Sequence, residues 1–344
     1  MKKTVFLSAL AAAGLAASGA MAQDSGSSTL AAVKDHGALK CGVNPGTPGF
    51  AAPDANGVWK GFDVDLCRAV AAAIFGDPEK VEYTPLTSAV RFTALSSGEV
   101  DMLARNTTWT FSRDVDLKLE FTGVNYYDGQ GFMVPKDLGV SSAKELEGAT
   151  VCIETGTTTE LNLADFFRIN GMDYEPVPVE SFTEAQNQFL AGACDVYTTD
   201  ASALAASRAS FENPADYVVL PEIISKEPLG PLVRHGDSEW GDVVRWTLNA
   251  MVSAEELGVT SANAADMAAN GTENPEINRL LGSEGELGAM LGLPNDFGLN
   301  IITKVGNYGE SFEANIGEST PVGLARGLNA LWTEGGLIYS PPFR

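Results

Sequence analysis

The chain repeats one order of secondary structure in two separate stretches. In each, short apolar runs typical of buried strands alternate with segments of helical periodicity that end at glycine. The first stretch predicts strands at 38–43, 81–86 and 100–104 and helices at 62–75 and 89–97; the second predicts strands at 149–154, 174–179 and 194–198 and helices at 159–170 and 183–191. This alternation predicts an α/β fold of two similar lobes, each with a parallel-rich sheet covered by helices. Ligand groups are then expected at the carboxyl ends of the strands.

Glycines and apolar runs also indicate where the chain crosses between the lobes. Residues 129–135 contain two glycines in a strand-like run, and residues 229–235 form a second such run. We expect these two crossings to form the hinge. The segment Ser319-Thr320-Pro321 is typical of a helix cap followed by proline in the first turn, so a late helix is expected there. The resulting division is 23–129 for the first part of lobe 1, 130–235 for lobe 2, and 236–344 for the return to lobe 1 with a helical C-terminal extension.

The N-terminus has the pattern of an export signal. Lys2 and Lys3 precede an apolar run at 5–17, and Ala20-Met21-Ala22 provides a small-x-small cleavage site. A membrane anchor is the alternative, but the apolar run is shorter than the roughly 20 residues that cross a bilayer. We expect residues 1–22 to be a signal peptide cleaved near Ala22, followed by a polar arm at 23–29, and the mature protein to be soluble in the periplasm.

Charge and cysteine content limit the possible partners. A net charge of −23 argues against nucleic acid or an anionic membrane as partner, although it permits a small anionic ligand held by local groups. The four cysteines allow three pairings, and export favours disulfides. Since each half holds two, we predict Cys41–Cys67 and Cys152–Cys194. A metal site is not expected, because no C-x-x-C spacing occurs and the only histidines are His36 and His235.

Two hydroxyl-rich segments directly follow strand-like runs, one in each half. They are Arg105-Asn106-Thr107-Thr108-Trp109-Thr110-Phe111-Ser112-Arg113 and Glu154-Thr155-Gly156-Thr157-Thr158-Thr159-Glu160. The first offers hydroxyls and a guanidinium whose fork matches a carboxylate. The second offers hydroxyls and amides at a helix start, which is also an anion site. Together with Asp200, which could hold an ammonium group, these segments predict capture of a free amino acid.

Several motifs, in a fixed order, carry a family resemblance. They are Gly61-Phe62-Asp63-Val64-Asp65-Leu66, Gly98-x-x-Asp101 leading into Asn106-Thr107-Thr108, Arg113, Phe121-Thr122, Gly156-Thr157-Thr158 and Asp200. The chain resembles the polar amino-acid-binding proteins of bacterial ABC importers. Its tail, with Val305-Gly306-Asn307-Tyr308-Gly309-Glu310 and Arg326-Gly327-Leu328-Asn329-Ala330-Leu331-Trp332, resembles the larger subgroup for general L-amino-acid or glutamate/glutamine/aspartate/asparagine uptake.

The resemblance implies a two-lobed, type II periplasmic-binding-protein fold with a two-strand hinge. It also implies a monomer without cofactor or catalytic activity, which passes an L-amino acid to the permease subunits of an inner-membrane importer. The alternative is a cyclohexadienyl or arogenate dehydratase on the same fold, which would need a general acid in the cleft.

The resemblance also implies roles for individual residues. Arg113, helped by Thr108 and Thr158, would hold the α-carboxylate, and Asp200 and the Asn106 carbonyl would receive the α-ammonium. Ser88 and Arg91 would meet a side-chain carboxylate. Thr157 is a further predicted ligand-binding residue, although Thr157 and Thr158 could also serve only to start the helix. Further possible pocket residues are Asn44, Thr47, Phe50, Arg105 and Trp109. Other readings stay open: a surface ion pair for Arg113 with Asp114 or Asp116, a helix cap for Asp200, an ion pair with an acid for Arg105, and core positions for the aromatic residues.

Overall fold

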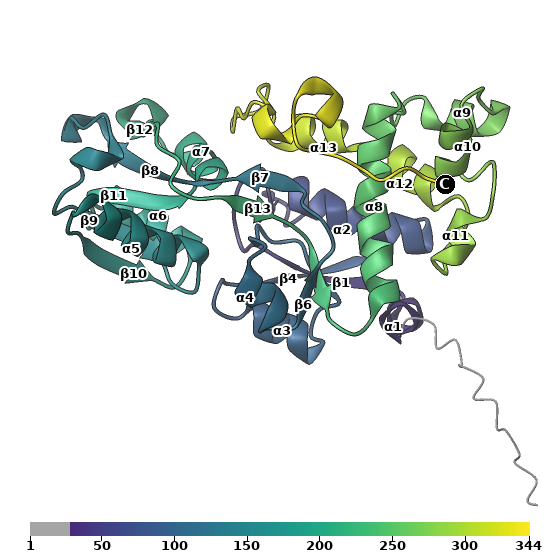
Figure 1. The fold of residues 1–344 in the computed structure, drawn as a ribbon, viewed down its shortest axis with the longest axis horizontal. Coiled ribbons are helices and arrows are strands. Elements are labelled where there is room, and N and C mark those ends of the chain that lie inside the picture. The colour runs from purple at the N-terminus through teal and green to yellow at the C-terminus, as the bar shows by residue number, and fades with distance from the viewer. Residues whose placement is uncertain (1–27) are drawn as a thin grey trace, which may run out of the picture.

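A computed structural model describes residues 28–344, and the predicted signal peptide and most of the polar arm lie outside them. The described chain forms two lobes, each built on a five-stranded sheet (Figure 1). In order across the first sheet the strands are β4 (Val81–Pro85), β1 (Leu39–Val43), β5 (Met102–Leu103), β14 (Leu232–Arg234) and β6 (Leu119–Phe121). In the second they are β10 (Glu175–Val179), β9 (Thr150–Glu154), β11 (Val196–Asp200), β8 (Gln130–Pro135) and β12 (Tyr217–Val219). The predicted two-lobed α/β fold is confirmed.

The two sheets share one topology. In each, the first strand of the repeat lies between the second and the third and pairs with both in parallel. Two more strands complete each sheet through antiparallel pairs, β14 and β6 in the first and β8 and β12 in the second. The sheets are therefore mixed, with their parallel part formed by the repeated strand–helix units. A short hairpin, β2 (Ala52–Pro53) and β3 (Trp59–Lys60), precedes α2 in lobe 1.

Helices cover the sheets largely where periodicity predicted them. Lobe 1 has α1 (Ser28–His36), α2 (Phe62–Phe75), α3 (Arg91–Ser97), α4 (Phe111–Val115) and α8 (Ser238–Glu256); lobe 2 has α5 (Thr158–Asn170), α6 (Phe182–Leu190) and α7 (Ala201–Ser210). Helix α2 has the predicted bounds. It begins after Gly61, whose φ of 135° and close approach to the Phe50 carbonyl leave no room for a β-carbon. Thr157 caps α5 by accepting a hydrogen bond from the Glu160 N–H.

The C-terminal extension packs on lobe 1 (Figure 1). Its helices are α9 (Ala264–Asn270), α10 (Pro275–Leu280), α11 (Leu287–Met290), α12 (Phe297–Lys304) and α13 (Tyr308–Asn315), and short 3₁₀ turns occur at Lys136–Leu138, Ala143–Glu145, Pro214–Asp216, Gly327–Asn329 and Trp332–Glu334. Phe297, Tyr308 and Phe312 are buried in one apolar core with residues of α2 and α8. The extension is thus part of the lobe 1 core.

The helix predicted to start at Ser319-Thr320-Pro321 is absent, so that prediction is wrong. Instead, the Leu324 N–H donates to the carbonyl of Ile316, the residue after α13. Gly323 and Gly327 both have positive φ, which is incompatible with a continuous right-handed helix. The cap and proline therefore belong to a turn.

Two short strands connect the lobes. β7 (Tyr126–Asp128) and β13 (Glu227–Leu229) pair antiparallel and cross between the sheets (Figure 1). Both crossings lie a few residues before the predicted ones, because β8 already belongs to the second sheet and β14 to the first. The chain has thus returned to lobe 1 before residue 235, the predicted boundary.

The structure has the two predicted disulfides, and each lies within one lobe. Cys41 of β1 is bonded to Cys67 of α2, with Cα atoms 6.2 Å apart. Cys152 of β9 is bonded to Cys194, which precedes β11, with Cα atoms 5.7 Å apart. Neither disulfide crosses the hinge, so both leave the lobes free to move relative to one another.

Candidate functional site

A small polar pocket lies between the lobes, where strand ends and helix starts from both meet. Its cavity volume is about 40 Å³. Most of the predicted ligand-binding residues line it, namely Asn44, Thr47, Ser88, Arg91, Arg105, Asn106, Thr108, Thr157, Thr158 and Asp200. Glu154, Thr159, Phe182, Thr199 and Ala203, which were not predicted to bind a ligand, line it as well. Phe50, Trp109 and Arg113 are not among the lining residues.

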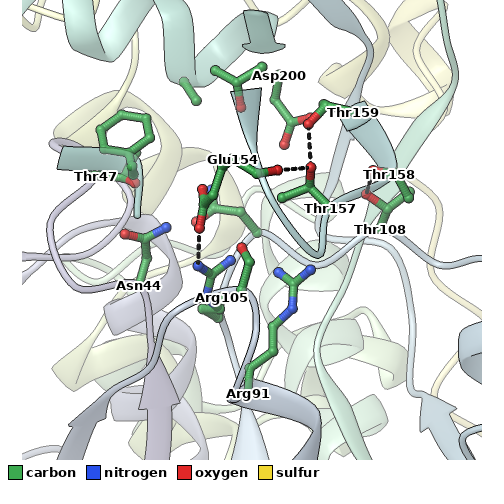
Figure 2. A pocket seen from close by; sticks show the side chains of 15 residues that line it. Asn44, Thr47, Arg91, Arg105, Thr108, Glu154, Thr157, Thr158, Thr159 and Asp200 are labelled. Atoms are coloured by element: carbon green, nitrogen blue, oxygen red, sulfur yellow. Dashed lines mark hydrogen bonds and ion pairs between the residues drawn. The ribbon is translucent and has the colours of Figure 1, made fainter. Parts of the chain in front are cut away.

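Two buried guanidinium groups lie at the lobe 1 side of the pocket (Figure 2). The Arg105 Nε donates to the Leu86 carbonyl at 2.9 Å. The Arg91 guanidinium makes a long contact of 3.4 Å from Nη1 to the Thr107 hydroxyl and lies 4.7 Å from the centre of the Phe92 ring. Burial lowers the pKa of both arginines, and neighbouring guanidinium groups lower the pKa of Arg91 further. An anionic group in the pocket would relieve this repulsion.

The Glu154 carboxylate faces Arg105 across the pocket (Figure 2). Its Oε1 lies 3.7 Å from Nη2 of Arg105, beyond the 2.7–2.9 Å of a charge-assisted hydrogen bond. This is the ion pair with an acid that the sequence left open for Arg105. Several buried polar atoms of the pocket have no hydrogen-bond partner within residues 28–344: Thr47 Oγ1, Arg91 Nε, Asn106 Nδ2 and Oδ1, and Glu154 Oε1. Buried polar groups are rarely left unpaired, so these atoms mark positions for a polar ligand.

Asp200 lies at the end of β11, on the lobe 2 side. Its side chain makes no capping hydrogen bond to α7, so the cap reading is not realised. Burial raises the pKa of Asp200 well above its ordinary value, and the carboxylates of Asp128 and Glu227 raise it further, against the opposing effect of Arg91 and Arg113. A bound ammonium group would stabilise the ionised form of this carboxylate.

Asn106 has an unusual backbone conformation at the pocket wall. Its φ is 41°, in the left-handed region that asparagine tolerates better than most residues. Its N–H donates to Asp63 Oδ2 at 3.0 Å, and the Asn125 amide donates to the other oxygen of the same carboxylate at 3.0 Å. Burial raises the pKa of Asp63 to about 6, although both hydrogen bonds oppose this shift. Asp63 therefore fixes Asn106 in place.

Glu227 joins the two lobes beside the pocket. It is almost fully buried in β13, and its Oε2 accepts hydrogen bonds from Thr108 of lobe 1 at 2.5 Å and from Thr158 of lobe 2 at 2.9 Å. Its Oε1 accepts from Asn162 and Ser225, both at 2.7 Å. The hydroxyls of Thr108 and Thr158, predicted to meet a ligand carboxylate, thus point at a carboxylate of the protein.

Arg113 lies behind the pocket wall. Its Nη1 donates to the Thr108 carbonyl at 3.0 Å, and its guanidinium lies 5.2 Å from the centre of the Phe92 ring. Burial lowers its pKa to about 10, with Glu227 and Asp200 opposing the shift. Asp114 contacts Trp109 and His235 rather than Arg113, so Arg113 does not form the surface ion pair with Asp114 that the sequence left open. It belongs to the same charged cluster as Asp200.

Phe50 and Trp109, the two aromatic residues predicted for the pocket, pack against other aromatic rings. Phe50 is buried and packs edge-on against Phe62 and Tyr126. Trp109 is 40% exposed and stacks on Phe121. Neither lines the pocket, in agreement with the core reading for Phe50.

Comparison with known proteins identifies the family. Residues 39–263 match the model of the bacterial extracellular solute-binding proteins, family 3. The chain belongs to this family. It is 64% identical to the glutamate/glutamine/aspartate/asparagine-binding protein BztA of Rhodobacter capsulatus over the full length of both chains. It is 55% identical to the general L-amino acid-binding periplasmic protein AapJ of Rhizobium johnstonii, covering 99% of this chain and 100% of that protein.

A solved structure is also close to this solute-binding protein. The ABC transporter periplasmic binding protein from Brucella ovis with glutathione bound is 57% identical, with a TM-score of 0.90, covering 92% of this chain and 99% of that one. The curated relatives above are named as binding proteins rather than enzymes. Neither histidine lines the pocket: His36 contacts Glu82, and His235 contacts Asp114. Among residues 28–344, no group of three or more His, Cys, Asp or Glu side chains is arranged to hold a metal ion. No helix of that range is both long and apolar enough to cross a membrane.

The sequence placed Glu154 in the second hydroxyl-rich segment but gave it no ligand role, and it did not single out two further acidic residues of this solute-binding protein, Asp128 and Glu227. Asp128 directly precedes the predicted crossing at 129–135, and Glu227 lies two residues before the one predicted at 229–235. A charged residue directly before an apolar crossing is the signal that could have located both.

Proposed function

We propose that this protein is the periplasmic amino-acid-binding component of an ABC importer. It binds free L-amino acids with acidic or amide side chains and delivers them to the permease subunits in the inner membrane. The observation that carries this proposal is the arrangement of the pocket, where buried guanidinium groups from lobe 1 and a buried carboxylate from lobe 2 face the same polar space. The names of the relatives support the same ligand class.

The unpaired groups suggest how an amino acid lies in the pocket. Asp200 and the Asn106 carbonyl receive the α-ammonium group. Arg113 and the first N–H groups of α5, which have no partner within the helix, attract the α-carboxylate. Thr108 and Thr158 contribute through their backbone positions, because Glu227 engages their hydroxyls. The side chain then points toward Arg91, Arg105 and Ser88.

Closure of the two lobes couples binding to delivery. The pocket is formed by residues of both lobes, so only a closed arrangement lets a ligand contact all of them. Bending at β7 and β13 provides the movement, as in other hinged binding proteins. Micromolar binding corresponds to about 8 kcal/mol, which a few charge-assisted hydrogen bonds supply. The permease then recognises the closed, loaded monomer.

Calorimetry on the purified, exported protein tests the proposal. Titration with glutamate, glutamine, aspartate, asparagine, leucine and glutathione should give micromolar or tighter binding for the first four. Parallel incubation with prephenate and arogenate should give no product. Absence of binding for all of these amino acids would contradict the proposal, and turnover of arogenate would support the dehydratase instead.

A further inference from the structure

The side-chain end of the pocket contains a donor and an acceptor that are both unpaired. Arg91 Nε and Glu154 Oε1 are buried and have no hydrogen-bond partner within residues 28–344. Arg91 comes from the start of α3 in lobe 1, and Glu154 from the end of β9 in lobe 2. Both line the pocket together with Arg105, whose guanidinium faces Glu154 (Figure 2). A group that both accepts and donates would satisfy the two atoms at once.

A terminal carboxamide is such a group. Its oxygen can accept from Arg91, and its NH₂ can donate to Glu154. A carboxylate has only acceptor atoms, so it would use the guanidinium groups and be repelled by an ionised Glu154. Glu154 alone therefore distinguishes amide from acidic side chains of the ligand, provided that its carboxylate can change its hydrogen-bond partner.

The geometry of Glu154 permits that change. At 3.7 Å its Oε1 is close enough to Arg105 for attraction but too far for a hydrogen bond. A small rotation toward Arg105 would complete the ion pair and turn the carboxylate away from an acidic ligand. In its present position the same oxygen is open to a ligand NH₂.

Resting on the proposed function, we propose that Glu154 is a specificity-determining residue that lets one pocket accept both amide and acidic side chains. With an amide ligand, Glu154 accepts a hydrogen bond from the ligand NH₂. With an acidic ligand, Glu154 turns to Arg105, and Arg91 holds the ligand carboxylate. Arg91 thus serves both classes, whereas Glu154 favours the amide.

The test is the ratio of glutamine to glutamate affinity in the variant Glu154→Gln, measured by calorimetry at fixed pH and salt. Removal of the charge weakens the acceptor for glutamine and ends the repulsion of glutamate. The ratio should shift toward glutamate by about tenfold or more. Glu160→Gln is the matched control, since Glu160 is exposed at the same helix start and does not line the pocket, and its ratio should be that of the wild type. Glu154→Met has a side chain of similar length without charge and should shift the ratio in the same direction. It replaces Glu154→Gln in the test if that variant does not fold.

The outcomes separate the two proposals. A shift of the affinity ratio toward glutamate in the Glu154 variants, with no shift in Glu160→Gln, supports the inference. An unchanged ratio, or equal losses for both ligands, overturns it while leaving amino-acid binding intact. Failure of the wild-type protein to bind either ligand overturns the proposed function itself.

Discussion

Replacement of Glu227 by glutamine should weaken the binding of all amino acids by the same factor. Glu227 accepts hydrogen bonds from Thr108 of lobe 1 and from Thr158 and Asn162 of lobe 2, so opening of the lobes must break at least one of these contacts. The carboxylate therefore stabilises the closed arrangement without touching the side-chain end of the pocket. Because the ligand is a zwitterion, the loss of one nearby charge alters its attraction only slightly.

The magnitude follows from the hydrogen bonds. A bond to a charged acceptor contributes about 1.5–3 kcal/mol and a neutral one about 0.5–1.5 kcal/mol. Glutamine weakens each contact by about 1 kcal/mol and also places an NH₂ group against one pair of donors. Because opening breaks either the contact to Thr108 or the two contacts to Thr158 and Asn162, the closed state loses about 1–2 kcal/mol, and Kd rises roughly 5- to 30-fold.

Calorimetry with glutamate and glutamine measures both the loss and its uniformity, and small-angle scattering at saturating ligand reports whether the lobes still close. Glu222→Gln is the matched control. Glu222 accepts hydrogen bonds from Ser142 and Ala143 within lobe 2 alone, so its replacement should leave Kd unchanged. A Glu227→Gln protein with wild-type Kd, or with an altered glutamine-to-glutamate ratio, would refute the reasoning.

The remaining predictions concern charges. Arg113→Ala should weaken the binding of every ligand, because its charge attracts the α-carboxylate from behind the pocket wall. Arg91→Ala should weaken the binding of glutamate more than that of leucine, and equal losses for both ligands would remove the side-chain role of Arg91. Burial raises the pKa of Asp128 to about 6, so its contribution to the free energy of unfolding is largest below about pH 4 and is lost as the pH rises to 6. Urea unfolding of Asp128→Asn should lack this part of the pH dependence, and identical pH profiles for variant and wild type would contradict it. Binding of an amino acid should release protons from Asp200, because a bound ammonium group favours the ionised form of this carboxyl. Calorimetry in buffers of different ionisation enthalpy measures the number of protons released. Asp200→Asn should abolish the release, and an unchanged release in this variant would show that the protons come from another group.

Short sequence patterns predicted the helices and strands because each pattern lies within the element that it specifies. The apolar stripe of α2 and the glycines at its two ends define its bounds, and the carboxyl ends of β5, β9 and β11 carry pocket residues because parallel strands end at one edge. The pairing of four cysteines followed from their division between the lobes. Such features need only short stretches of sequence.

Contacts between distant segments were not predictable in the same way. Thr108 and Glu227 lie 119 residues apart, and no periodic pattern links them, so the hydroxyl of Thr108 was assigned to a ligand. The side chain of Arg113 was likewise expected in the pocket, but it turns to the Thr108 carbonyl behind the wall. The turn at Ser319-Thr320-Pro321 depends on pairing with residues after α13, which outweighs the local helix signal.

The C-terminal extension has a mechanical consequence for the hinge. The Asn329 side chain accepts from the Tyr127 N–H at 2.6 Å and donates to the Tyr127 carbonyl at 3.1 Å. Tyr127 is the middle residue of β7, so Asn329 of the C-terminal extension is hydrogen-bonded to the edge of one connecting strand, as a third strand would be. Any rotation of that strand must carry the 3₁₀ turn at Gly327–Asn329 with it or break both bonds. The angle through which the molecule can open is thereby tied to a segment about 200 residues further along the chain.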